Sequence, residues 1–272
     1  MRRAVFVGML LILSLTAAAC AAGEQAVVGL PDAPVTDLGG REVTIMVENA
    51  YPPFNFIDEA NNEGAGWDYD VWREICRRLN CTPVFVEAAW PPFEMLAGGE
   101  VDVAADGITL TYPRSLVIDY SDPYVEYGQV MVVRSDSPWA TEEEFVADES
   151  ALVGTQPGTT NEGVALKLVG EARVKGYSEN PIAVEALLAG DVDGVPLDEV
   201  AAVEYLKQHP DDLKSGFKFT SGEMLAFIYP PGSPLIGPVN IALQEMANDG
   251  TMDQYCQLWL LRNCSPEVKE LE

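Results

Sequence analysis

The sequence predicts an α/β fold built from two successive runs in which strands and helices alternate. The first run starts with alternating apolar residues at 42–47 and continues through an amphipathic helix at 68–79 to a strand at 83–87. A second run starts with an apolar strand at 151–155. Alternation of this kind is typical of sheets covered by helices. The 272 residues, 48% of them hydrophobic, are enough for one large core or two modest ones.

The other elements of the first run can be placed in order. A loop at 48–53 follows the carboxyl end of the first strand, where open α/β sheets bind ligands. A short helix at 90–96 leads into a strand that starts at residue 101. The apolar segment 129–133 is predicted as a strand that leaves this part of the fold.

Helix starts mark the second run. The segment 141–144 resembles a capping box, and Gly-Thr-Thr-Asn at 158–161 is a further helix start. The predicted strands of this run are 151–155, 173–177, 192–195 and 217–220, and its predicted helices are 182–188 and 198–207. A strand at 223–229 then returns to the first part of the fold, which ends with helices at 236–247 and 252–261.

The most informative stretch is 102–124. An apolar run ends at Gly107, Thr111 suits the cap of a new helix, and Pro113 suits its first turn. Arg114 would then lie in the first helical turn, where a cation opposes the helix dipole, so its position needs a local reason. An anionic ligand is one reason, because the guanidinium fork matches a carboxylate. A surface arginine paired with a nearby acid is the alternative.

The same stretch carries a family resemblance. Gly-Ile-Thr-Leu-Thr-x-x-Arg, which ends at Arg114, and Asp-Tyr-Ser-x-Pro-Tyr at 119–124 resemble the signature of the polar amino-acid-binding proteins of ABC importers. Upstream, the aromatic–proline loop 51–54 and the segment 66–70 resemble that family's first loop and the start of its first helix. The resemblance extends from about residue 42 to about residue 261.

This resemblance implies a two-lobed fold of the type II periplasmic-binding-protein kind, in which each lobe is a sheet flanked by helices. Lobe 1 is expected to comprise 41–133 together with 223–272, and lobe 2 to comprise 134–222. The ligand cleft would lie between the lobes. The implied function is that of a monomeric receptor, without cofactor or catalytic residues, which delivers an amino acid to a membrane permease.

The resemblance also implies how the cleft would bind the backbone groups of an amino acid. Arg114, Thr109 and the amide of Gly107 match the family's carboxylate site in lobe 1, and Thr160 matches its partner in lobe 2. Asp198 matches the acceptor of the α-amino group. Simple helix capping is the alternative role of Thr160 and of Asp198.

Four further positions match the part of the family's cleft that holds the ligand's side chain. Tyr51 and Trp90 match aromatic residues that stack on it, although large aromatic residues are usually core residues. Glu48 and Asp106 match positions at its distal end. The Glu48 position is commonly acidic in relatives that take basic or amide side chains. Asp106 departs from the small residue expected there.

The N-terminal segment 1–19 has the basic start, apolar centre and small-residue end of a signal peptide. Cleavage before Cys20 would resemble a bacterial lipoprotein, with a lipidated N-terminus and a flexible tether at 20–40. Ordinary cleavage that leaves Cys20 unlipidated is the alternative, because Ala17 replaces the leucine usual in the lipoprotein signal. We therefore expect an exported protein in the periplasm or lipid-anchored at the outer face of the cell membrane.

Four cysteines remain besides Cys20, and they permit three pairings. We predict the local disulfides Cys76–Cys81 and Cys256–Cys264, because each pair lies in or just beyond a predicted helix. A metal site has no support, since the sequence has no Cys-x-x-Cys motif and His209 is its one histidine.

Charge and motifs exclude several other functions. Sixteen basic against 43 acidic residues give a net charge of −27, which disfavours nucleic acids and anionic lipid surfaces as partners. No dinucleotide-binding, Walker A or zinc-protease motif occurs. The alternative to a receptor is a secreted cyclohexadienyl (prephenate) dehydratase on the same fold, with Asp198 or Glu48 as general acid. A sensor feeding a membrane kinase is disfavoured, because no such domain follows residue 272.

Overall fold

Two five-stranded sheets organise residues 36–264, the part of the chain that the computed structural model describes. The first sheet has the order β5-β1-β6-β15-β7, in which β1 runs parallel to β5 and β6 while β15 is antiparallel to both of its neighbours. Its strands are β1 (Glu42–Val47), β5 (Thr82–Glu87), β6 (Val103–Ala104), β7 (Asp119–Tyr120) and β15 (Ile228–Tyr229).

The second sheet has the order β11-β10-β12-β9-β13. Its strands are β9 (Gln129–Arg134), β10 (Val153–Thr155), β11 (Val174–Gly176), β12 (Gly194–Asp198) and β13 (Leu213–Lys218). The sequence prediction assigned 129–133 to lobe 1, but β9 pairs with β12 and β13. Every residue from Gln129 to Val133 is buried, so the apolar run contains no alternation that shows which sheet it joins. The other predicted lobe limits stay predictions.

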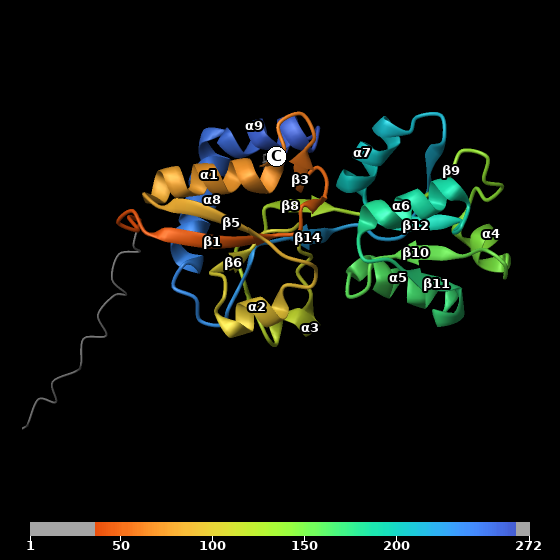
Figure 1. Cartoon of the computed structure of the whole chain (residues 1–272), viewed down its shortest axis with the longest axis horizontal. Helices are drawn as coiled ribbons and strands as arrows, with labels where there is room; N and C mark the ends of the chain where they lie inside the picture. The colour runs from red at the N-terminus through yellow and green to blue at the C-terminus, as the bar shows by residue number, and fades with distance from the viewer. Residues whose placement is uncertain (1–35, 265–272) are drawn as a thin grey trace, which may run out of the picture. The chain divides into compact units, whose positions relative to one another are not determined.

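A two-stranded ribbon connects the two sheets. It consists of β8 (Val125–Tyr127) and β14 (Glu223–Leu225), which pair antiparallel and lie between the sheets in Figure 1. The chain passes from the first sheet to the second along β8 and β9, and it returns along β13 and β14. The single strand predicted at 223–229 is therefore two short strands, β14 and β15, in different sheets.

Helices cover both faces of the first sheet. On one face, Val43, Ile45 and Val47 of β1 share a core cluster with residues of α1 (Trp67–Leu79), α8 (Ile236–Asp249) and α9 (Thr251–Trp259). On the other face, Met46 packs with Leu96 of α2 (Phe93–Gly98), and α3 (Tyr112–Ser115) follows further along the chain. The predicted helix 90–96 begins only at Phe93, because two prolines precede it and the residue before a proline avoids helical backbone.

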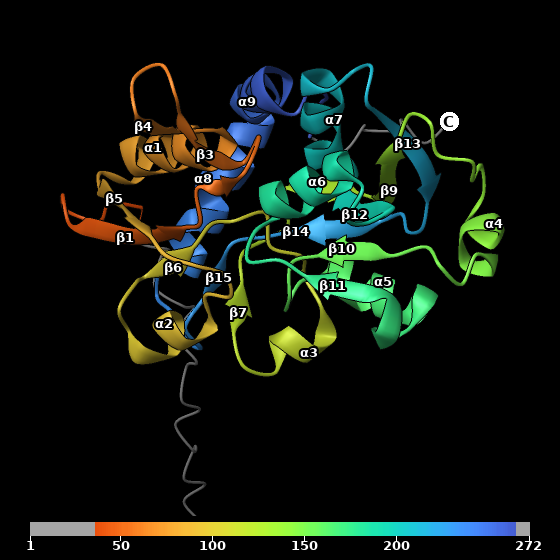
Figure 2. The ribbon, with the colours of Figure 1, turned by 45° about the vertical axis from the view of Figure 1, so that its right-hand side comes forward.

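The second sheet is covered in the same way, as Figure 2 shows. Val132 and Leu197 pack with residues of α6 (Asn180–Ala189) and α7 (Glu199–Gln208). Met131 and Val133 pack on the opposite face with residues of α4 (Glu142–Ala147) and α5 (Thr160–Val169). A single 3₁₀ turn, η1 (Glu171–Arg173), follows α5. Alternate residues of β9 thus support two separate layers of helices.

One small sheet was not predicted. Its strands, β2 (Ala50–Tyr51), β3 (Asn55–Asp58) and β4 (Glu63–Ala65), are two to four residues long and therefore lack a usable alternation pattern. The turn that leads from β4 into α1 depends on Gly66, which has a φ of 121°. A Cβ there would lie 2.3 Å from the Phe54 carbonyl oxygen, so only glycine allows this close approach.

Both predicted disulfides, Cys76–Cys81 and Cys256–Cys264, are present in the structure. Each joins the end of a helix to the segment that follows it, which prevents the last turn from fraying. We expect mass spectrometry of a non-reduced tryptic digest to find these two linkages. Free thiols at all four positions, or peptides linked across the two pairs, would contradict the assignment.

The predicted signal peptide, Cys20 and the tether up to residue 35 lie outside the described residues. Within residues 36–264, the structure contains no helix long and apolar enough to cross a membrane.

Candidate functional site

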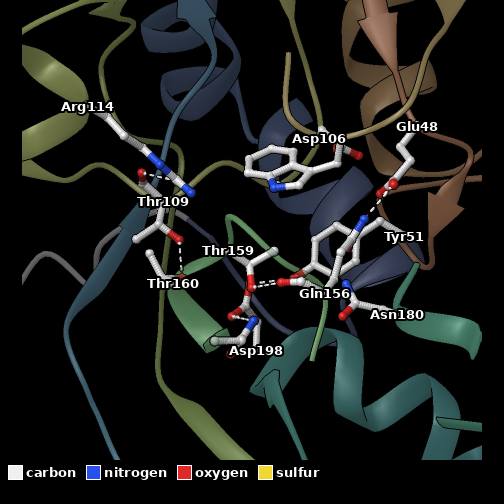
Figure 3. A pocket seen from close by; sticks show the side chains of 13 residues that line it. Glu48, Tyr51, Asp106, Thr109, Arg114, Gln156, Thr159, Thr160, Asn180 and Asp198 are labelled. Carbon is white, nitrogen blue, oxygen red and sulfur yellow. Dashed lines mark hydrogen bonds between the residues drawn. The ribbon is translucent and has the colours of Figure 1, made fainter. Parts of the chain in front are cut away.

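A pocket lies between the two sheets, and all nine predicted ligand-binding residues line it. Its lining comes from the ends of strands and the loops that follow them, together with α3 and the starts of α5 and α6. The predicted residues are Glu48, Tyr51, Trp90, Asp106, Gly107, Thr109, Arg114, Thr160 and Asp198, and the unpredicted ones are Gln156, Thr159, Asn161 and Asn180. Figure 3 shows Arg114 at one end of the pocket and Glu48 at the other.

Arg114 is held by neutral groups. Thr111 caps α3 by accepting a hydrogen bond from the Arg114 amide, as predicted. The guanidinium donates to the carbonyl oxygens of Thr109 and Gly158, each at 3.1 Å, and its carbon lies 5.2 Å from the centre of the Trp90 ring. Burial lowers the pKa of Arg114. No ion pair within residues 36–264 includes Arg114, so the alternative of a surface salt bridge is wrong and the positive charge is available to an anion.

Thr160 approaches the Arg114 end of the pocket from α5. Its hydroxyl lies 3.2 Å from the Thr109 hydroxyl and accepts a hydrogen bond from Gln129 at 3.0 Å. The helix cap is Thr159, which accepts from the amide of Glu162, so the capping role considered for Thr160 is wrong. Thr160 is the first residue of α5, and its hydroxyl bonds to Thr109 and Gln129 at the pocket rather than to the amides of its own helix.

Gly107 allows the pocket wall to close. Its φ is +52°, and a Cβ at this position would lie 2.5 Å from a ring carbon of Tyr51. The glycine therefore permits both the left-handed backbone and the close approach of the Tyr51 ring. That ring stacks on Phe54 with a centroid distance of 5.3 Å, so Tyr51 belongs partly to the core, as the alternative interpretation held.

Asp198 is the last residue of β12 and the cap position of α7, but its side chain makes no capping bond. Instead, the buried carboxylate accepts hydrogen bonds from the Tyr51 hydroxyl, from Asn161 at 3.2 Å and from Gln129 at 3.4 Å. The interpretation of Asp198 as a simple cap is therefore wrong. Burial raises its pKa to about 6, while these three donors act in the opposite direction.

The far end of the pocket is acidic. Glu48 accepts a hydrogen bond from Gln156 at 2.6 Å, which connects the two sheets across the pocket. Burial, and then the nearby charge of Asp106, raise the pKa of Glu48 to about 8. Burial also raises the pKa of Asp106 to about 7. Both carboxyls therefore bind protons more readily than ordinary acids do.

Sequence reasoning missed four polar lining residues, namely Gln156, Thr159, Asn161 and Asn180. Gln156 directly follows β10, and Asn180 is the first residue of α6. The rule that ligands lie at the carboxyl ends of strands could have found both.

The sequence profile of the bacterial extracellular solute-binding proteins, family 3, matches residues 43–262. The chain belongs to this family. The match covers nearly the same residues as the resemblance found in the sequence, and the two-lobed α/β prediction is confirmed.

Family 3 relatives with known ligands resemble the chain over most of its length. The L-cystine-binding protein TcyA of Bacillus subtilis is 29% identical over 220 residues, which are 80% of each chain. The arginine-, lysine-, histidine-binding protein ArtJ of Geobacillus stearothermophilus superposes with a TM-score of 0.76 and 29% identity, over 84% of this chain and 97% of its own.

A third neighbour bears on the dehydratase alternative. The ancestral amino-acid-binding protein AncCDT-1, described as a precursor of cyclohexadienyl dehydratase, superposes with a TM-score of 0.75 and 28% identity, over 80% of this chain and 95% of its own. This neighbour is itself described as a binding protein.

The raised carboxyl pKa values predict that this family 3 protein loses stability as the pH rises. The pKa values of Asp68, Asp106 and Glu48 are about 8, 7 and 8, against ordinary values of 3.8, 3.8 and 4.5. At a pH between its ordinary pKa and its raised folded-state pKa, each carboxyl is protonated in the folded state and ionised in the unfolded state. The free energy of unfolding therefore falls from about pH 4 to pH 8. We expect the midpoint of ligand-free thermal unfolding to be lower at pH 8 than at pH 5, whereas a higher midpoint at pH 8 would contradict the burial of these acids.

Proposed function

We propose that the chain is the extracytoplasmic receptor of an ABC importer and that it binds an amino acid between its two lobes. The observation that carries the proposal is the pair Arg114 and Asp198. Arg114 has no ion-pair partner among residues 36–264, and Asp198 is a buried carboxylate. Both line the same pocket, which they approach from different sheets. A zwitterion offers a carboxylate to the first group and an ammonium to the second. The ligands named for TcyA and ArtJ, cystine and basic amino acids, support this choice.

The charge of the pocket favours a cationic side chain. The ligand's α-carboxylate and α-ammonium groups would neutralise Arg114 and Asp198. The acids at the other end of the pocket, Glu48 and Asp106, would then still lack a positively charged partner. Buried carboxylates are costly unless they meet a cation, a donor or a proton. We therefore propose that arginine, lysine or ornithine binds best, that an amide such as glutamine comes second, and that acidic amino acids bind worst.

Contacts across the pocket indicate how binding would drive closure. Tyr51 bonds to Asp198, Glu48 to Gln156 and Thr109 to Thr160, so each pair joins the two sheets. A ligand that contacts both members of such pairs binds the closed conformation more tightly than the open one. This difference in affinity stabilises the closed conformation. The proposed permease would recognise this closed form. The protein would act as a monomer, attached to the membrane by a lipid on Cys20.

A thermal-shift screen of the twenty amino acids tests the proposal, because a ligand that binds only the folded state raises its unfolding temperature. Affinities for arginine, glutamine and glutamate, measured by calorimetry, would then test the order of preference. Tightest binding of glutamate would contradict the charge argument. Incubation with prephenate is the matched test of the dehydratase alternative, and formation of phenylpyruvate would favour that alternative.

A further inference from the structure

Asn55 joins two buried carboxyls behind the acidic end of the pocket. Its Nδ2 atom donates to Asp68 at 2.9 Å and to Asp106 at 2.8 Å, and its Oδ1 atom accepts from the amide of Asn49 at 2.7 Å. Asn55 and Asp68 are fully buried, and Asp106 is 5% exposed. Asp106 lines the pocket, whereas Asp68 lies in the first turn of α1 and does not. The amide therefore connects a pocket residue to an acid outside the pocket.

No ion pair in the described part of the chain neutralises this group of acids. Among residues 36–264, the ion pairs include neither Asp68, Asp106 nor Glu48. The Oδ1 atom of Asp68 is buried without a hydrogen-bond partner in this part of the chain, and so is the nearby Tyr124 hydroxyl. Two buried carboxyls and the partly buried carboxyl of Glu48 cannot all be ionised cheaply. Bound protons are therefore the positive charges left to neutralise these carboxyls.

Other titratable groups face these acids from several elements. Asp106 lies near Tyr51 and Tyr124, which are neutral because burial raises both pKa values well above 10. Glu179, which precedes α6, adds a further negative charge near Glu48 from the second sheet. These neighbours add no positive charge, and the acid from the second sheet reinforces the tendency of Glu48 to hold a proton.

We propose that Asp68, acting through Asn55, is a positioning residue that sets the protonation of Asp106, so that a cationic amino-acid side chain displaces a proton from the acidic end of the pocket. The inference rests on the proposed function, since it requires an amino acid in this pocket. The balance is simple: the ligand brings one positive charge, and one proton leaves the Glu48–Asp106 pair for the solvent. A neutral amide leaves the proton in place.

The raised pKa values of about 8 for Asp68 and about 7 for Asp106 support this assignment. They set the pH window in which the proton must leave. Below the pKa of the pocket acids, the ligand must displace a proton in order to bind. For each proton displaced, arginine affinity then falls by up to about tenfold for every unit by which the pH is lowered. Protonation of Asp198 weakens arginine and glutamine binding alike, so the ratio of the two affinities isolates the acidic end.

Calorimetry with L-arginine and L-glutamine on the full chain tests the inference. Titrations from about pH 5.5 to 8.5 in two buffers of different ionisation enthalpy report both affinity and proton release. We expect arginine to release about one proton more than glutamine does, because displacement of a proton from Asp198 is common to both ligands, and we expect the arginine-to-glutamine affinity ratio to rise with pH. Equal proton release by arginine and glutamine, at a constant affinity ratio, would overturn the inference but leave the proposed function intact. Failure of every amino acid to bind would overturn both.

Two variants separate positioning from a merely structural role, because they move the pH profile in opposite directions. Asp68→Asn removes an acid whose charge, present in the upper part of this pH range, raises the pKa of Asp106, so the midpoint of the affinity ratio should move to lower pH. Asn55→Ala removes the donor that stabilises the Asp106 carboxylate, so the midpoint should move to higher pH. Asp70→Asn, on the same helix but outside the bridge, is the matched control and should leave the midpoint unchanged. Coincident profiles in folded Asp68→Asn and Asn55→Ala would overturn the role of Asp68 and Asn55.

Discussion

Arg114→Ala is expected to abolish amino-acid binding while leaving the fold intact. Loss of the charged partner of a carboxylate in a closed cleft costs on the order of 2–5 kcal/mol of binding free energy. Within residues 36–264 the guanidinium contacts two carbonyl oxygens and the rings of Trp90 and Phe93, so the variant loses no ion pair in this part of the chain. Calorimetry with the best ligand of the thermal-shift screen measures the loss of affinity, and the ligand-free unfolding temperature reports the fold.

Arg114→Lys should also bind poorly, because a point charge cannot replace the planar fork of donors. Arg77→Ala is a suitable control. Arg77 is a largely exposed arginine of α1 that pairs with Glu74 on the outer surface, and its loss should leave affinity unchanged. Near-native affinity in Arg114→Ala would show that the carboxylate site lies elsewhere.

The order of elements could be predicted because it depends on local patterns. The strand at 42–47, the helix at 68–79 and the cap at Thr111 all have signals within a few residues, and all three appear in the structure. Segments without such a signal were misplaced. The strand predicted at 217–220 lies at Leu213–Lys218, where its pairing with β9 fixes the register and includes an irregularity. Partner choice between strands overrides the local apolar pattern.

The candidate site was partly predictable for a different reason. Arg114 and Gly107 belong to one continuous stretch, so their resemblance to a family signature placed them together. Gln156 meets Glu48 across 108 positions of the sequence, and Asn55 meets Asp106 across 51. Such contacts depend on how segments far apart in the sequence are brought together in the fold. No local pattern of residues in either segment records that arrangement.

Asp198→Asn is expected to weaken amino-acid binding and, at pH 8, to stabilise the ligand-free protein. The Asp198 carboxylate is the proposed partner of the ligand's ammonium group. Its replacement by a neutral amide should therefore cost about 2–5 kcal/mol of binding free energy. The same charge is buried among neutral donors, no ion pair within residues 36–264 includes it, and burial raises its pKa to about 6. A neutral side chain of equal size avoids this desolvation above that pH.

Asp198→Asn is expected to lower the affinity for the ligand but to raise the stability of the ligand-free protein. These opposite changes distinguish a ligand-binding acid from a structural one. Asp193 supplies the contrast, because it lies 3.5 Å from Arg134 and accepts a hydrogen bond from the Leu152 amide. Asp193→Asn should therefore lower the unfolding temperature and leave affinity unchanged. Calorimetry and thermal unfolding of both variants at pH 8 make the comparison. If Asp198→Asn lost stability and kept its affinity, Asp198 would be a structural acid, and the ammonium of the ligand would need another acceptor in the pocket.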